Sequence, residues 1–136
     1  MSDIADVDFA KRAAAEIDAL HRVLQAWLRG EEDADVGRVL SRFHRNYRMV
    51  GAAGSVVTYE QMATVFPKLR GTRPSLIMEI REVDVRHVEG TSAVVSYLEI
   101  QKEEERATQR WSVALLVDTP ERSAPLWKHL QETFIP

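Results

Sequence analysis

Apolar residues recur at helical spacing through the first third of the chain. Such a stripe predicts a long helix over residues 7–29, which Gly30 would end. The stripe consists of Ile17, Leu20, Leu24, Trp27 and Leu28. A second, shorter stripe with spacings i, i+3, i+4 and i+7 predicts another helix. It consists of Val36, Val39, Leu40 and Phe43.

Two short strands and a third helix are expected next. The segments 47–54 and 55–59 are rich in β-forming residues and flank a glycine-containing turn. Thr58 stands three residues before Gln61, which is the spacing of a capping box. We therefore expect a third helix that begins after Thr58 and runs toward Leu69.

The rest of the chain alternates apolar and polar residues, as strands do. In residues 75–90 the alternation slips between Ile80 and Val83, which predicts a β-bulge. Three more strands are expected over residues 91–101, 107–117 and 126–136. Together the pattern predicts an α+β fold, with three N-terminal helices packed on one face of a strongly curved, mostly antiparallel six-stranded sheet.

The hairpin between the second and third of these four strands decides which side chains share a sheet face. If the charged stretch 102–106 turns at its centre, Glu99 lies opposite Arg110 and Tyr97 opposite Ser112. Face one is then apolar at one end and polar at the other: Ala93, Val95, Tyr97, Glu99, Arg110, Ser112 and Ala114. Face two is almost entirely apolar: Val94, Leu98, Ile100, Trp111, Val113 and Leu115.

The register of the last hairpin is ambiguous by one residue, and a one-residue slip moves every side chain to the other face. We prefer the register with Gln131 opposite Ser112 and Thr133 opposite Arg110, because it gathers the polar residues on one face. Face one then gains Trp127, His129, Gln131 and Thr133. Face two gains Leu130 and Phe134.

Both sheet faces would carry apolar area, and three helices can cover only one of them. An uncovered apolar face indicates a partner, most simply a second copy of the chain across a two-fold axis. We therefore expect a homodimer in which Trp111 acts as an interface anchor. The expected interface consists of Leu98, Ile100, Trp111, Val113, Leu115, Leu130 and Phe134.

The composition limits the number of domains, the classes of partner and the cellular location that we expect. A chain of 136 residues suits a single domain over residues 1–136, and its net charge of −3 gives no electrostatic reason to expect nucleic acid or a membrane as a partner. The absence of cysteine rules out disulfides and thiolate chemistry and suits the cytoplasm. We expect no transmembrane helix and no signal peptide, because no apolar run is long enough and the first residues lack a basic start.

Five segments in a characteristic order cover about residues 19–134. They are "LQAWLRGEEDADVGRVLSRFHRNY", "GAAGSVVTYEQM", "SAVVSYLEIQ", "RWSVALLV" and "WKHLQETF". Together they resemble the NTF2-like superfamily of cone-shaped, cystatin-like α+β proteins, and within it the SnoaL-like or DUF4440-like group. The resemblance implies that face one is concave and lines a ligand pocket, and that face two is convex and forms dimers.

The chain also departs from its apparent relatives. Gln131 and Thr133 stand where SnoaL-like proteins often carry two histidines, and Glu99 replaces a pocket arginine of the similar kinase association domain. Aligned with ketosteroid isomerases, the oxyanion tyrosine falls on Val23 and the general base on Gly51. We do not expect that isomerase chemistry here.

Eight residues are the candidate ligand contacts: Tyr97, Glu99, Arg110, Ser112, Trp127, His129, Gln131 and Thr133. Arg110 could bind a ligand carboxylate through its planar fork, with Glu99 as an acid or base; the alternative is a structural ion pair. His129 is a second weak catalytic candidate, or else a core histidine. The four histidines show no metal-ligand spacing, so we expect neither a metal nor a cofactor.

Three functions remain open from the sequence. The first is a binding module that holds a small organic ligand between the helices and the concave sheet face. The second is an enzyme of SnoaL-like type, an isomerase, dehydratase or hydrolase, acting on a small polar molecule. The third is a structural or accessory dimer with a vestigial pocket.

Overall fold

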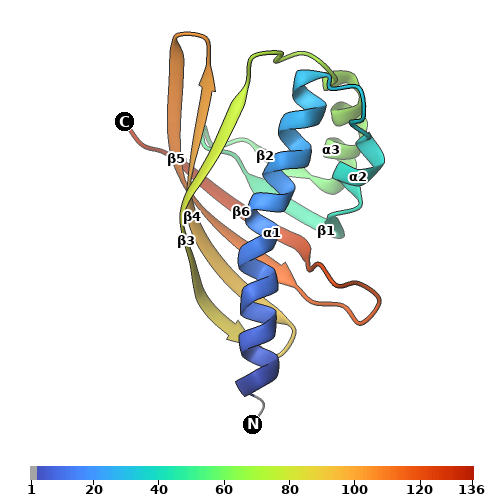
Figure 1. Cartoon of the computed structure of the whole chain (residues 1–136), viewed down its shortest axis with the longest axis vertical. Coiled ribbons are helices and arrows are strands. Elements are labelled where there is room, and N and C mark those ends of the chain that lie inside the picture. The colour runs from blue at the N-terminus through green and yellow to red at the C-terminus, as the bar shows by residue number, and fades with distance from the viewer. Residues whose placement is uncertain (1–2) are drawn as a thin grey trace.

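A computed structural model describes residues 3–136 as an α+β fold with one long helix, two short helices and a six-stranded sheet (Figure 1). The helices are α1 (Asp3–Arg29), α2 (Val36–Leu40) and α3 (Tyr59–Val65), and α3 continues into the 3-10 turn η1 (Phe66–Leu69). The strands are β1 (Phe43–Val50), β2 (Val56–Thr58), β3 (Ile77–Glu89), β4 (Ser92–Glu103), β5 (Arg106–Val117) and β6 (Leu126–Phe134).

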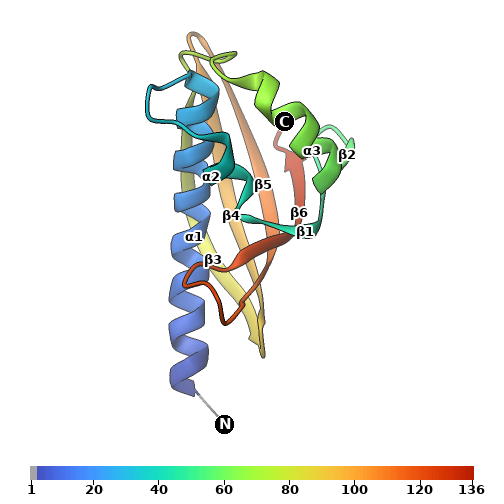
Figure 2. The same ribbon diagram turned by 90° about the vertical axis from the view of Figure 1, so that its right-hand side faces the viewer.

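The strands follow the order β2-β1-β6-β5-β4-β3, which puts β6 in the middle of the sheet. Neighbouring strands are antiparallel except β1 and β6, which run parallel. The expected six-stranded, mostly antiparallel sheet is confirmed. The expectation of three N-terminal helices on the sheet is wrong, because the structure has one long helix and two short ones; the order of the elements, with α3 after β1 and β2, is as expected. Helix α1 alone runs along the sheet, whereas α2 and α3 lie near the C-terminal end of α1 (Figures 1 and 2).

The C-terminal end of α1 is tied to the loop before β3. Gly30 ends the helix with a positive φ of 76°, and a Cβ atom there would lie 2.9 Å from the backbone of Gly71. The N–H of Gly71 donates to the carbonyl of Trp27, and the N–H of Arg73 donates to that of Leu28 at 2.9 Å. These contacts hold Arg73 at one end of the sheet.

The predicted second helix extends too far, because Phe43 begins β1 instead of closing the helix. Phe43 pairs with Trp127, and its ring packs 4.6 Å from that of Tyr47. The N–H of Trp127 donates to the carbonyl of Arg42 at 2.9 Å, which draws the chain into the sheet directly after α2. Tertiary pairing with β6 therefore overrides the helical spacing.

Three local predictions are confirmed. Thr58 and Gln61 form the capping box at the start of α3. The register of β3 shifts between Arg81 and Asp84, where the bulge was expected. In the β4–β5 hairpin, Glu99 lies opposite Arg110, as its central turn requires.

The preferred register of the last hairpin is wrong. Ser112 lies opposite Glu132, and Arg110 lies opposite Phe134. The cause is a bulge at Lys128, because Leu116 pairs with Trp127 while the preceding Leu115 pairs with His129. Because of the extra residue, Trp127 stays on the concave face, and every side chain of β6 beyond Lys128 lies on the face opposite to the one predicted.

The reversal changes the side of six side chains. Leu130, Glu132 and Phe134 lie on the concave face, and His129, Gln131 and Thr133 lie on the convex face. Leu130 is accordingly part of the buried core. Leu130 and Phe134 therefore do not belong to the convex surface that the sequence predicted for dimerisation.

The core lies between α1 and the concave face of the sheet. Trp127 is fully buried at its centre, surrounded by apolar side chains from α1, β1, β4 and β5. They include Phe9, Ile17, Leu20, Phe43, Val95, Ala114 and Leu116. Among the helices of residues 3–136, none has the length and apolar character needed to cross a membrane.

Candidate functional site

The concave face changes from apolar to polar toward the β4–β5 hairpin tip. The strand register places Tyr97, Ser112 and Glu132 side by side in one row across β4, β5 and β6. The next row toward the tip contains Glu99, Arg110 and Phe134. Since directly opposed residues share a face, these six side chains form one polar layer beside the apolar core.

A buried ion pair joins this layer to α1. The Nε2 atom of His21 lies 2.9 Å from Oε1 of Glu99, and its Nδ1 atom lies 2.7 Å from the carbonyl oxygen of Ile17. That carbonyl can only accept, so Nδ1 carries a proton and the second ring proton is shared with Glu99. Burial lowers the pKa of His21, but the Glu99 carboxylate outweighs it, and the pKa is raised. The Glu99 carboxylate therefore favours the charged form of His21.

Glu99 has partners on both carboxylate oxygens. Besides His21, it accepts a hydrogen bond of 2.6 Å from Nε2 of Gln101 on its second oxygen. Burial raises the pKa of Glu99, but His21, Gln101 and Arg110 together bring it below its ordinary value. Gln101 in turn accepts from Arg73 at 3.1 Å, and Arg73 also pairs with Glu103. A continuous chain of hydrogen bonds therefore runs from the hairpin tip to α1.

Arg110 is much less well satisfied than Arg73. Its side chain is only 13% exposed, yet its contacts with Glu132 and Thr108 measure 3.4 and 3.5 Å, at the outer limit for hydrogen bonds. Its Cζ atom lies 4.8 Å from the centre of the Phe134 ring, which is a cation–π distance. Arg110 thus packs against an aromatic ring and makes only long contacts with its acceptors, and its Nε has no partner among residues 3–136.

The two acidic residues beside Arg110 have opposite electrostatic environments. Burial raises the pKa of Glu132, the nearby Glu99 carboxylate raises it further, and Arg110 only partly opposes them. The pKa of Glu99 moves the other way. Two carboxyl groups whose pKa values are driven apart are typical of sites that handle protons or anions.

Three buried polar atoms of this layer have no hydrogen-bond partner outside the layer among residues 3–136. They are the hydroxyl of Tyr97, the hydroxyl of Ser112 and Nε of Arg110. Burial and the carboxylates of Glu99 and Glu132 raise the pKa of Tyr97 well above its usual value, so its hydroxyl remains a donor. Unsatisfied buried polar groups are rare in proteins and destabilising, so this layer differs from the apolar core beside it.

A pocket of about 210 Å³ opens at the polar end of this layer. Arg110 contributes to its wall, together with residues from the hairpin tip and the loop before β3. They are Arg73, Gln101, Glu103, Arg106 and Thr108. Three arginines against one acidic residue make the pocket suitable for an anion.

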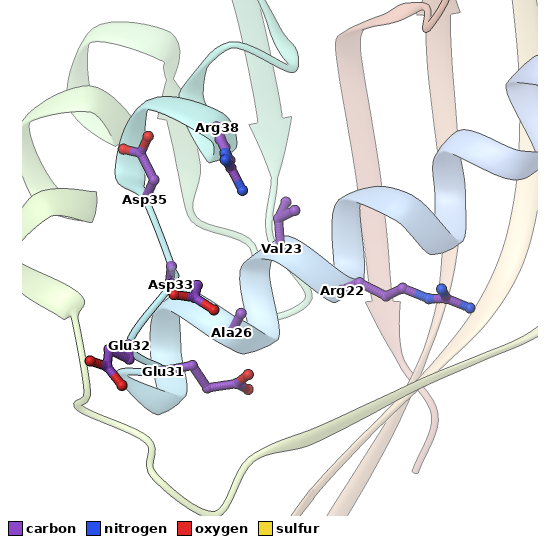
Figure 3. Close-up of a pocket in the computed structure, with 9 residues that line it drawn as sticks. Arg22, Val23, Ala26, Glu31, Glu32, Asp33, Asp35 and Arg38 are labelled. Carbon is purple, nitrogen blue, oxygen red and sulfur yellow. The ribbon is translucent and has the colours of Figure 1, made fainter.

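A second groove, of about 310 Å³, lies between α1 and the loop before α2 (Figure 3). Its acidic side chains do not converge: Glu31 and Glu32 point to opposite sides, and Arg22 extends away from them (Figure 3). Asp35 accepts from the N–H of Gly37 as the cap of α2. The groove is therefore a weaker candidate than the pocket beside Arg110.

The structure brings together five of the eight predicted site residues, all on the concave face: Tyr97, Glu99, Arg110, Ser112 and Trp127. It places His129, Gln131 and Thr133 on the opposite face. Trp127 lies in the core, where its Nε1 donates to Glu16 at 3.0 Å. Within residues 3–136, no three acidic or histidine side chains group as a metal site requires.

Sequence reasoning missed His21 and Glu132. The signal for His21 was present, since it follows Ile17 by four residues and Leu20 by one, inside the apolar stripe of α1. Glu132 was placed on the wrong face by the register error.

Comparisons with known proteins place this geometry in a family. No family model and no curated protein matches the chain. Among solved structures, an NTF-2-like protein of unknown function from Pseudomonas aeruginosa is 31% identical, with a TM-score of 0.85 over 93% of this chain and 99% of its own. The fold is also similar to the CaMKII hub of S. rosetta (15% identity, TM-score 0.68, 90% and 96% covered). A third match is an NTF2-like protein of unknown function in nutrient uptake from Rhodospirillum rubrum (14% identity, TM-score 0.64, 88% and 98% covered).

The six strands curve around one long helix, and the identity to the Pseudomonas protein extends over nearly the whole chain. The chain therefore belongs to the NTF2-like family.

Proposed function

We propose that the protein binds a small organic anion, a carboxylate, at the polar end of its concave face, with Arg110 as the principal contact. The observation that carries this proposal is the state of Arg110. Its guanidinium is largely buried, its two nearest acceptors are distant, and its Nε has no partner among residues 3–136. A carboxylate placed in the fork of a guanidinium satisfies two donors at once, and such bidentate pairs are strong.

The pocket limits the size and class of the ligand. Its volume of about 210 Å³ lies below the roughly 300–1,000 Å³ of pockets for drug-sized molecules, so the ligand is small. Gln101 and Thr108 supply neutral polar contacts, and Arg106 adds a positive charge at the rim. Both oxygens of Glu99 are already bound by His21 and Gln101, which favours binding over acid–base work by Glu99.

The test of this proposal is a titration with small carboxylates, followed by thermal shift and calorimetry. We expect Arg110→Gln to weaken binding about 10- to 100-fold, because hydrogen bonds to charged groups contribute about 1.5–3 kcal/mol. Arg110→Lys should also bind poorly, since an ammonium cannot form the planar fork. Arg81→Gln on the convex face is the matched control and should bind normally. The proposal fails if no carboxylate binds the wild type at millimolar concentration, or if Arg110→Gln binds equally well.

We further propose that the convex face pairs with a second copy of the chain. Trp111 and Val113 are 49% and 44% exposed, and Leu98 and Leu115 lie partly exposed beside them on the same face. Glu79 on this face pairs with both Arg81 and Lys102, so charges of both signs flank the apolar centre. A surface with an apolar centre and mixed charges can complement itself across a two-fold axis.

Light scattering at micromolar concentration should report a dimer for the wild type. Trp111→Glu should give a folded monomer, because it places a charge at the centre of the apolar patch. Val65→Glu, on the exposed surface of α3, is the matched control and should remain dimeric. A wild-type monomer, or a dimer unaffected by Trp111→Glu, contradicts this interface.

A further inference from the structure

We propose that Glu132 couples ligand binding to proton uptake: the bound carboxylate replaces Glu132 as the partner of Arg110, and Glu132 takes up one proton as it loses that partner. This inference rests on the proposed function and adds its regulation by pH. The ligand is thus a small carboxylate whose binding consumes a proton.

Arg110 is the cation that Glu132 and the ligand would share, because Arg73 is paired with Glu103 and Arg106 lies at the exposed rim of the pocket. Glu132 is 8% exposed and pairs with Arg110 at 3.4 Å. A ligand carboxylate in the Arg110 fork brings a second negative charge to the same guanidinium. Two carboxylates that share one cation in a buried place cannot both stay ionised without a large energetic cost, so one of them binds a proton.

Titratable side chains from four elements surround Glu132. They come from every element packed near it: His21 on α1, Tyr47 on β1, Tyr97 and Glu99 on β4, and Arg110 on β5. The charge of His21 is already matched by Glu99, and both tyrosines are neutral. Arg110 is therefore the main cation that stabilises an ionised Glu132, and its engagement by a ligand weakens that stabilisation.

The row of Tyr97, Ser112 and Glu132 offers hydrogen-bond partners for a protonated Glu132. Ser112 lies directly opposite Glu132, and Tyr97 lies directly opposite Ser112. The hydroxyls of both residues are buried and have no hydrogen-bond partner among residues 3–136 other than each other. A protonated Glu132 can donate to the Ser112 oxygen, and its other oxygen can accept from a hydroxyl. The row of three side chains can therefore accommodate the neutral acid.

The electrostatics support the same direction. Burial and Glu99 already raise the pKa of Glu132, while Arg110 is the main influence that lowers it. Loss of the Arg110 contact must raise this pKa further. The free protein therefore releases from Glu132 a proton that the complex retains, and ligand binding strengthens as the pH falls.

Calorimetry with propionate as the probe tests the coupling. Titrations over a range of pH, in buffers of different ionisation enthalpy, should show proton uptake that approaches one per ligand between the pKa values of free and ligand-bound Glu132, and there the affinity should fall about tenfold per pH unit. Glu132→Gln should bind propionate with little pH dependence and without proton uptake. Glu79→Gln, an acidic residue of the convex face, is the matched control and should keep the coupling.

A second measurement needs no variant. The carboxyl carbon of Glu132, followed by NMR in the labelled wild type, should titrate at higher pH when propionate is saturating than when it is absent. Propionate binding without proton uptake, proton uptake that persists in Glu132→Gln, or an unchanged NMR titration overturns this inference alone. Failure of the wild type to bind propionate or any other small carboxylate overturns the proposed function, and the inference with it.

Discussion

Replacement of Glu99 by alanine should lower the free energy of unfolding by about 3–5 kcal/mol, as expected when one partner of a buried ion pair is removed. Glu99 is 1% exposed, and its carboxylate is the acceptor for His21 and Gln101. Without it, His21 must either remain charged in an apolar environment or lose its proton. Denaturant unfolding of the variant and the wild type measures the loss.

Two controls separate the ion pair from simple loss of volume. The double variant His21→Leu with Glu99→Leu removes both charges and should recover much of the stability, because apolar side chains can replace a buried pair at little cost. Glu103→Gln breaks the more exposed pair with Arg73 and should cost about 1 kcal/mol or less. A double variant as unstable as Glu99→Ala would contradict this account.

The same pair makes stability depend on pH in a defined direction. The pKa of His21 is raised from 6.5, so its contribution is complete below pH 6.5 and is lost as the pH rises through the higher value of the folded state. The pKa of Glu99 is lowered from 4.5, so its contribution is complete above pH 4.5 and is lost as the pH falls through the lower value. The stability that this pair provides is therefore greatest between pH 4.5 and 6.5, and the double leucine variant should lack this maximum.

Trp127→Ala should be as damaging, with a loss of about 3–5 kcal/mol, because truncation of a large core side chain leaves a cavity. Trp127 is fully buried, and its ring contacts those of His21, Phe43 and Tyr97. Thermal and denaturant unfolding should both report the change.

A second substitution divides the role of Trp127 into volume and hydrogen bonding. Trp127→Phe keeps most of the ring but removes the donor to Glu16, which should cost about 1–3 kcal/mol. Trp111→Ala is the control, because it also removes an indole but from an exposed site. In dilute solution, where a dimer dissociates, Trp111→Ala should change the free energy of unfolding by less than about 1 kcal/mol. Equal losses for the two alanine variants would show that Trp127 does not organise the core.

Much of the fold follows from local patterns in the sequence. The stripe of α1, the capping box of Thr58 and Gln61, and the β4–β5 hairpin depend on residues close in the chain, and all three are predictable. Phe43 has helical spacing but is drawn into the sheet by its pairing with Trp127, a partner more than 80 residues away. Local periodicity carries no information about such a contact.

The site was only partly predictable for a related reason. Glu99 and Arg110 face each other across a tight hairpin, so simple counting from the turn finds them. Glu132 lies beyond a bulge at Lys128, and one extra residue reverses which side chains face the pocket. His21 was visible as a polar residue in an apolar stripe, but its partner Glu99 lies 78 residues away.

The central position of β6 has a consequence for the way the chain folds during synthesis. The hairpin of β1 and β2 and the sheet of β3, β4 and β5 are both made before Leu126, but they share no edge until β6 inserts between them. Until β6 is made, the nascent chain therefore holds two separate β units with exposed strand edges. Only β6 joins them, so the slow, long-range step of folding follows the synthesis of residues 126–134.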